Sequence, residues 1–378
     1  MKSLIVAGGG VAGIYASILI KKACPGLSLT VLEANDKTLR KLLATGNGRC
    51  NLSNRQMNSL FYEGTDLTQV EEIVSKFDIV DALKQLGIQT KWLNDLLYPR
   101  SEQAKTVRDV LMAHVEKLGI KVLTQTAILS IAYHRHTYHI TTDKQTFKSD
   151  GLILTMGTVA GGLSYGCDRA FILSPLYLNI RDYEPMLTKM VTKENLKSLK
   201  GTRVKGRITL KKDDHTLAVE DGELLFTNYG VSGIAVMNLS RDYVPGCTLH
   251  IDMMPDITLS ELKEMIISSP LDEPLTGLLP GELTKYFIKH HFDYPIIKNM
   301  TLHIVELKGA SDAQVMKGGI TLNQLNDHLE FKNYPHLYAA GEILDVTGLC
   351  GGYNLHFAFA SAARVAEGII DELKEDVT

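Results

Sequence analysis

The sequence has few of the features that mark a disulfide-rich, metal-binding or membrane protein. Its 378 residues contain five cysteines, and no two of them are spaced as Cys-x-x-Cys. This pattern argues against a disulfide framework and a cysteine-rich metal site, and it is typical of a reducing compartment. No stretch approaches the run of about 18 apolar residues that a membrane span needs, and the apolar N-terminus lacks a small-residue cleavage site. We therefore expect a cytoplasmic protein that binds no metal and enters no membrane.

An excess of one charge is also missing. The chain has 40 Lys and Arg against 43 Asp and Glu, a formal net charge of -3. Such a balance predicts no general attraction to nucleic acid or to an anionic membrane, although a local basic patch could still exist. We therefore expect a small-molecule substrate and no nucleic-acid partner, whereas the oligomeric state is not predicted by the sequence.

The feature around which the chain is organised is a glycine-rich turn near the N-terminus. A β-branched run ends at Ala7, glycines follow at positions 8, 10 and 13, and residues 14–22 are typical of a helix. This is the G-x-G-x-x-G pattern between strand and helix that binds the pyrophosphate of a dinucleotide, whereas a glycine turn without a ligand is the less favoured interpretation. A second strand ends in an acid twenty residues after Gly13, suited to the ribose hydroxyls. The residues expected to contact the dinucleotide here are Gly8, Gly10, Val11, Ala12, Gly13, Glu33 and Ala34.

A second glycine-rich segment follows at residues 44–54. It combines glycine and asparagine, which tolerate left-handed backbone, with Arg49. Such a loop could present N–H groups to a dinucleotide with Arg49 as a charge partner. It could equally be a surface turn with a solvated arginine.

The length of the chain predicts two domains. Between residues 186 and 310, short alternating strands separated by turn residues predict a small antiparallel β-structure, with helices near 260–268 and 282–291. We expect residues 1–185 and 311–378 to form a discontinuous nucleotide domain. The segment 186–310 would be an insertion that covers the cofactor and selects the substrate.

The run from Lys41 to Asn51, placed after the N-terminal glycine turn, resembles a bacterial flavoprotein family of the two-dinucleotide-binding-domain class. That family includes aminoacetone oxidases and a bile-acid reductase acting on 3-dehydro-Δ4,6 intermediates. Similar elements recur at residues 98–101, 341–345 and 351–355. The chain departs from the family at residues 155–158, where Thr-Met-Gly-Thr replaces Ala-Thr-Gly-Gly, and at Asn228, where histidine is common.

The resemblance implies an α/β fold in which a Rossmann-like FAD-binding domain carries a mostly antiparallel β insertion with a small helical part. It implies that Ile128 contacts the adenine, that Gly341 and Glu342 contact the ribityl chain, and that the start of the last helix faces the flavin N1/O2 edge. The further residues expected at the cofactor are Lys41, Thr45, Gly46, Asn47, Gly48, Arg49, Cys50, Asn51, Gly157, Gly352, Tyr353, Asn354 and Leu355.

The implied activity is that of an FAD-dependent oxidoreductase, which transfers a hydride between a small organic substrate and non-covalently bound FAD. Since the chain has only one G-x-G-x-x-G, NAD(P)H would be a diffusible co-substrate. We assign no catalytic residue; we interpret Cys350 as a small buried hydrophobic side chain rather than a redox group, and His356 as a packed or solvated histidine rather than a general acid. Two alternatives stay open, an oxygen-using flavin oxidase with an amine-type substrate and a non-enzymatic flavin-binding redox protein.

Overall fold

The computed structural model describes residues 1–375, and the chain divides into two compact units. Unit 1 consists of Met1–Glu184 and the chain from Val315 onward, and unit 2 consists of Pro185–Gln314. Each unit has its own hydrophobic core.

The centre of unit 1 is a five-stranded parallel sheet. Its order is β20 (Leu337–Ala339), β11 (Gly151–Leu154), β1 (Ser3–Ala7), β2 (Ser28–Leu32) and β7 (Lys121–Leu123). These strands are almost wholly apolar, as expected for a parallel sheet covered on both faces. The structure confirms the expected Rossmann-like α/β architecture.

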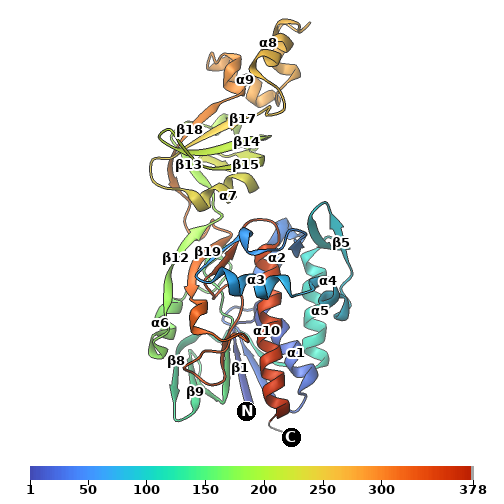
Figure 1. The fold of residues 1–378 in the computed structure, drawn as a ribbon, viewed down its shortest axis with the longest axis vertical. Coiled ribbons are helices and arrows are strands. Elements are labelled where there is room, and N and C mark those ends of the chain that lie inside the picture. The colour runs from blue at the N-terminus through green and yellow to red at the C-terminus, as the bar shows by residue number, and fades with distance from the viewer. Residues whose placement is uncertain (376–378) are drawn as a thin grey trace. The chain divides into compact units, whose positions relative to one another are not determined.

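Three long helices belong to unit 1, namely α1 (Val11–Ala23), α5 (Ala104–Lys117) and α10 (Tyr353–Glu375). Figure 1 shows α1 and α10 running side by side, and the rings of Tyr15 and Phe359 meet edge to face between them at 5.1 Å. Small residues in α10, such as Ala360 and Ala362, are buried and let the two helices approach.

Smaller elements complete unit 1, and some differ from the sequence expectation. The apolar periodicity of residues 70–86 predicts a single helix, but the structure has two, because Asp78 accepts hydrogen bonds from the amides of Val80 and Asp81 and caps a new helix. Residues 97–101 predict a loop, but the structure continues a strand to Pro99. The elements are α2 (Arg40–Ala44), α3 (Leu67–Ser75), α4 (Ile79–Gln85), α6 (Arg169–Leu173), the sheet of β3 (Ser53–Asn54), β6 (Leu96–Pro99) and β5 (Thr90–Leu93), the sheet of β8 (Ile128–His134), β9 (Thr137–Thr142) and β10 (Thr146–Ser149), and the pair β4 (Tyr62–Gly64) and β21 (Val346–Gly348).

The run 317–320 predicts a strand that joins the parallel sheet, but the structure places this strand elsewhere. β19 (Val315–Ile320) pairs with β12 (Ile180–Met186) in a two-stranded ribbon. This ribbon includes the points at which the chain leaves and re-enters unit 1.

Unit 2 is a closed antiparallel barrel with short helices, in agreement with the expected β-rich insertion. The barrel order is β13 (Met190–Thr192), β16 (Gly230–Ser232), β15 (His215–Phe226), β14 (Arg203–Lys212), β17 (Thr248–Asp252) and β18 (Met300–Leu307), and the helices are α7 (Ile234–Leu239), α8 (Leu259–Ile267) and α9 (Gly281–Lys289). The sequence predicts Ser260 as the cap of the helix near 260–268, but the cap of α8 is Thr258, in a capping box with Glu261.

Candidate functional site

The first glycine turn leaves room and donors for a phosphate. Gly8 has a φ of +115°, and a Cβ there would stand 2.4 Å from the carbonyl oxygen of Thr155. Gly10 precedes α1 and has no atom within 4 Å of a hypothetical Cβ. The amides of Val11, Ala12 and Gly13 precede the first helical hydrogen bond, and no acidic side chain occupies the first turn. These donors and the macrodipole favour an anion beside Gly10.

Glu33, at the end of β2, fixes this turn. Its carboxylate accepts hydrogen bonds from the Gly9 amide at 3.0 Å and from the backbone and side-chain nitrogens of Asn35 at 2.8 and 2.7 Å. Ala34 follows and is half-buried. The contact of Glu33 with a ribose stays a prediction.

A polar network joins three segments that are far apart in the sequence. Lys41 in α2 donates to Glu342 at 2.7 Å, and the hydroxyl of Thr158 donates to the other oxygen of Glu342 at 2.6 Å. The Lys41 and Glu342 side chains are 30% and 22% exposed. A Cβ on Gly157, which has a positive φ, would lie 3.8 Å from the same carboxylate. This half-buried cluster combines a cation and a carboxylate.

Gly341 links this network to the first turn. Its φ is +77°, its amide donates to Ser361 in α10 at 3.0 Å, and a Cβ there would be 2.9 Å from the Cβ of Ala12. The turns that follow β1, β11 and β20 therefore meet at the carboxyl edge of the parallel sheet. This is the edge where doubly wound α/β folds bind their ligands.

The loop from Thr45 to Asn51 is tightly wound. Gly46 and Asn47 have left-handed backbone, the short helical turn ends at Gly48, and the Cys50 amide donates to the Thr45 carbonyl at 3.0 Å. Burial raises the pKa of the Cys50 thiol to about 12, so the thiol is neutral. The buried Oδ1 of Asn51 has no hydrogen-bond partner. An orphaned acceptor at this position is consistent with a ligand that donates to it.

The guanidinium of Arg49 contacts other side chains of unit 1. It forms an ion pair with Glu102 and lies 4.7 Å from the centre of the Tyr98 ring. Lys91 is bound to the same glutamate. The structure therefore supplies Arg49 with a protein partner, and its role as a charge partner of the cofactor stays a prediction.

The start of α10 is held from several sides. The ring of Tyr353 stacks on Phe61 with the centroids 5.0 Å apart, and Tyr62 donates to the Tyr353 carbonyl at 2.9 Å. The Asn354 side chain accepts from the Gly348 amide at 2.8 Å and donates to the Gly348 carbonyl at 2.7 Å. That side chain is thus used within its own turn, and the contact of Gly352, Tyr353, Asn354 and Leu355 with the cofactor stays a prediction.

Ile128 is buried at the start of β8. The connection before it lies beside Glu33, since the Thr126 amide donates to the Glu33 carbonyl at 2.9 Å. The Ala127 amide is taken by Asp143 at 2.9 Å. The predicted adenine contact of Ile128 is not tested by these bonds.

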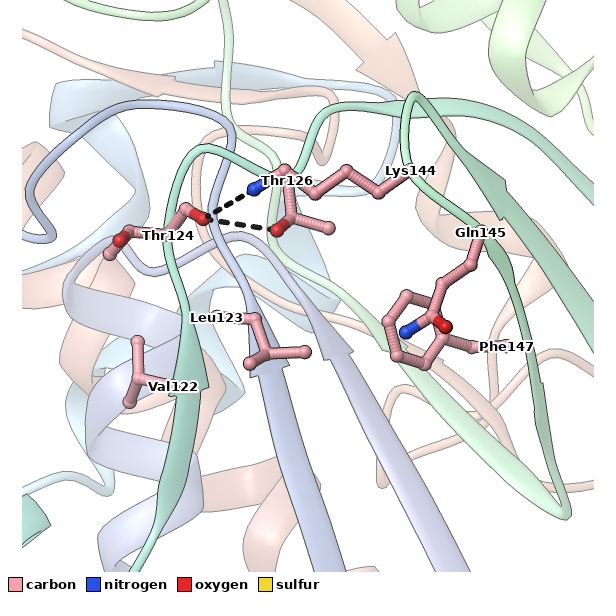
Figure 2. Close-up of a pocket in the computed structure, with 7 residues that line it drawn as sticks. All are labelled: Val122, Leu123, Thr124, Thr126, Lys144, Gln145 and Phe147. Atoms are coloured by element: carbon pink, nitrogen blue, oxygen red, sulfur yellow. Dashed lines mark hydrogen bonds between the residues drawn. The ribbon is translucent and has the colours of Figure 1, made fainter.

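A hollow of about 320 Å³ is lined in part by Thr124 and Thr126 of this connection (Figure 2). Figure 2 shows the Thr126 hydroxyl and the Lys144 ammonium both donating to the Thr124 carbonyl, at 3.0 and 3.4 Å. Its lining is Val122, Leu123, Thr124, Thr126, Lys144, Gln145 and Phe147. None of these residues was expected at the cofactor, and we assign the hollow no role in it.

Two hydroxyls at the site were not predicted from the sequence. Thr155 donates to the carbonyls of Ala7 and Gly8 at 3.0 and 2.9 Å, and Thr158 completes the Glu342 network. Both lie in the segment that departs from the family pattern, so the departure itself was the available signal.

The structure is that of a Rossmann-type dinucleotide-binding protein with its candidate site at the carboxyl edge of the sheet. Residues 2–368 match the family described as HI0933-like protein Rossmann domain, and the chain belongs to that family.

Among its relatives is a 3-dehydro-bile acid delta(4,6)-reductase of Clostridium scindens, 29% identical, with 96% of this chain and 97% of that protein covered. A ribosomal RNA dihydrouridine synthase of Escherichia coli is 26% identical, with 97% of each chain covered. The solved 3-ketosteroid-delta4-(5alpha)-dehydrogenase of Rhodococcus jostii RHA1 has a TM-score of 0.54 at 14% identity, with 97% of this chain and 96% of that chain covered. This last likeness shows a shared fold.

The comparisons confirm the family resemblance, and the family match together with the reductase relative supports an oxidoreductase of the FAD-dependent class. Within residues 1–375, no helix is both long and apolar enough to cross a membrane. In the same part of the chain, no group of three or more His, Cys, Asp or Glu side chains could hold a metal ion.

Proposed function

We propose that the chain reduces a carbon–carbon double bond conjugated to a carbonyl in a small organic substrate, using non-covalent FAD and diffusible NAD(P)H in the cytoplasm. The observation that carries the proposal is the meeting of the turns after β1, β11 and β20 with Lys41 at one sheet edge. The open space beside Gly10 and the orphaned acceptor of Asn51 fit a dinucleotide there.

The substrate class is suggested by two relatives. The names 3-dehydro-bile acid delta(4,6)-reductase and dihydrouridine synthase both describe the saturation of a ring double bond. We favour the small molecule over RNA because the chain carries a net charge of -3.

The residues of unit 1 would divide the binding of FAD among them. The first amides of α1 would bind the pyrophosphate, and Glu342, oriented by Lys41 and Thr158, would accept hydrogen bonds from the ribityl hydroxyls. The N-terminal end of α10 would favour negative charge at the flavin edge. Bound FAD supplies the hydride chemistry, and we assign the choice of substrate to unit 2 because every predicted cofactor residue lies in unit 1.

The test begins with the absorption spectrum of the purified protein. We expect a yellow protein that NADPH or NADH reduces rapidly under anaerobic conditions in a stopped-flow experiment. The reduced protein should then be reoxidised faster by a 3-oxo-Δ4,6 bile acid than by oxygen. Colourless protein that takes up no added FAD would refute the proposal, and faster reoxidation by oxygen would favour an oxidase. If ribosomal RNA reoxidises the reduced protein and the bile acid does not, the proposed small-molecule substrate is wrong and RNA is the substrate.

A further inference from the structure

His356 lies in the first turn of α10 and is only 3% exposed. Its Nε2 is 3.0 Å from the carbonyl oxygen of Val74, near the end of α3, and its Nδ1 is 2.8 Å from the hydroxyl of Ser53. The ring also meets Phe77 edge to face at 5.6 Å. Both nitrogens are therefore used inside the protein, and the ring has no edge left for a substrate.

The two contacts fix where the proton of the imidazole resides. A carbonyl only accepts, so Nε2 carries the hydrogen and donates to Val74. A neutral ring then has a lone pair on Nδ1, and Ser53 must donate its hydroxyl hydrogen to it. The alternative acceptor for Ser53, the Asn54 carbonyl, is farther away at 3.4 Å.

Ser53 is in turn the surface on which Gly352 rests. A Cβ on Gly352 would stand 2.7 Å from the backbone N, C and O atoms of Ser53, so the two backbones approach as closely as a glycine allows. Next to it, the Asn54 side chain donates to the Gly351 carbonyl at 3.2 Å. Gly351 and Gly352 have φ angles of +132° and +95°, which other residues rarely adopt. A chain of contacts thus runs from α3 through His356 and Ser53 to the glycine pair.

We propose that His356 is a positioning residue for the cofactor, which acts through Ser53 to hold the glycine pair 351–352 in the conformation that receives FAD. The inference rests on the proposed function, since it assigns the glycine pair to the flavin. It differs from a purely structural role, in which His356 would only join α3 to α10.

Two isosteric substitutions separate these roles. In His356→Asn, the amide occupies the place of Nδ1 and can keep the bond with Ser53. In His356→Gln, the amide reaches the place of Nε2 and can keep the bond with Val74. Ser53→Ala removes the hydroxyl that binds Nδ1, and with it the link from His356 to the Ser53 backbone against which Gly352 packs, without changing the histidine. For each variant, FAD titration of the full chain freed of its flavin would give the Kd, and the reloaded holoprotein would be measured by visible circular dichroism of the flavin and by thermal unfolding.

We expect the Kd for FAD to rise about tenfold in His356→Gln and Ser53→Ala and to stay within about twofold in His356→Asn, as the loss of one buried hydrogen bond predicts. The flavin dichroism should change in the same two variants. Equal effects of Asn and Gln, or unchanged FAD binding in both His356→Gln and Ser53→Ala, would overturn the positioning role and leave the proposed function intact. Failure of the wild-type protein to bind FAD would overturn both.

Discussion

The buried histidine makes the stability of the protein depend on pH in a way that one substitution should remove. Burial lowers the pKa of His356 from 6.5 to about 4, against the smaller opposing effect of the bond to Val74. The folded protein therefore keeps this ring neutral down to about pH 4, whereas in the unfolded chain the ring is protonated with its ordinary pKa of 6.5. Because the folded pKa is the lower one, its contribution to stability is present above about pH 6.5 and is lost as the pH falls toward about 4.

The size of the effect follows from the two pKa values. The difference of about 2.5 corresponds to about 3 kcal/mol at full protonation, of which about 2.5 kcal/mol is lost between about pH 7.5 and pH 4.5. This is a large share of the stability of an ordinary domain.

Urea unfolding at several pH values measures this loss. The wild-type protein should lose about 2.5 kcal/mol more than His356→Gln between about pH 7.5 and pH 4.5, at a fixed excess of FAD. The carboxylates titrate in both proteins, so their contribution cancels in the difference. Parallel pH profiles for the two proteins would refute the conclusion that His356 is buried in its neutral form.

Three further predictions concern the cofactor turns. In Gly13→Ala the new Cβ would stand 2.1 Å from a carbonyl oxygen, so the free energy of unfolding should fall by about 2–3 kcal/mol. Gly10→Ala should keep its Tm and bind FAD about tenfold more weakly. Thermal melting and FAD titration of both variants test this difference. The Cys50 thiol, with its pKa raised to about 12, should resist alkylation at about pH 8 until the protein unfolds, and mass spectrometry of the labelled peptides would expose early labelling. Lys41→Met should weaken FAD binding about tenfold, because Lys41 orients Glu342, the proposed acceptor for the ribityl hydroxyls. Arg49→Met should weaken it less than about twofold, because the partner of Arg49 is Glu102, which is not a predicted cofactor residue; the reverse order of the two Kd values would contradict this assignment.

The sequence predicted features that depend on local spacing. The glycines at 8, 10 and 13 and the acid at 33 follow one strand–turn–helix–strand unit, so their relation is set by neighbours in the chain. The break at Asp78 was also readable, since an aspartate that caps a helix is a local signal, but the apolar periodicity across it concealed the break.

Contacts between distant segments were beyond such reasoning. Thr158 and Glu342 are 184 residues apart, and Ser53 and His356 are 303 apart. Each residue type alone is unremarkable, and only the folded sheet edge brings the partners together. The ion pair of Arg49 with Glu102 was not predicted for the same reason, because it depends on how the β3–β6–β5 sheet folds back beside the loop.

The ribbon of β12 and β19 has a consequence for how such a chain can diversify. The strand that leaves unit 1 and the strand that returns to it pair with each other, so the segment 185–314 is connected through one two-stranded ribbon. A different inserted domain, longer, shorter or unrelated in sequence, would need only a first and a last residue close enough to join β12 and β19. Evolution could thus replace unit 2 while unit 1, which carries the predicted nucleotide site, stays unchanged.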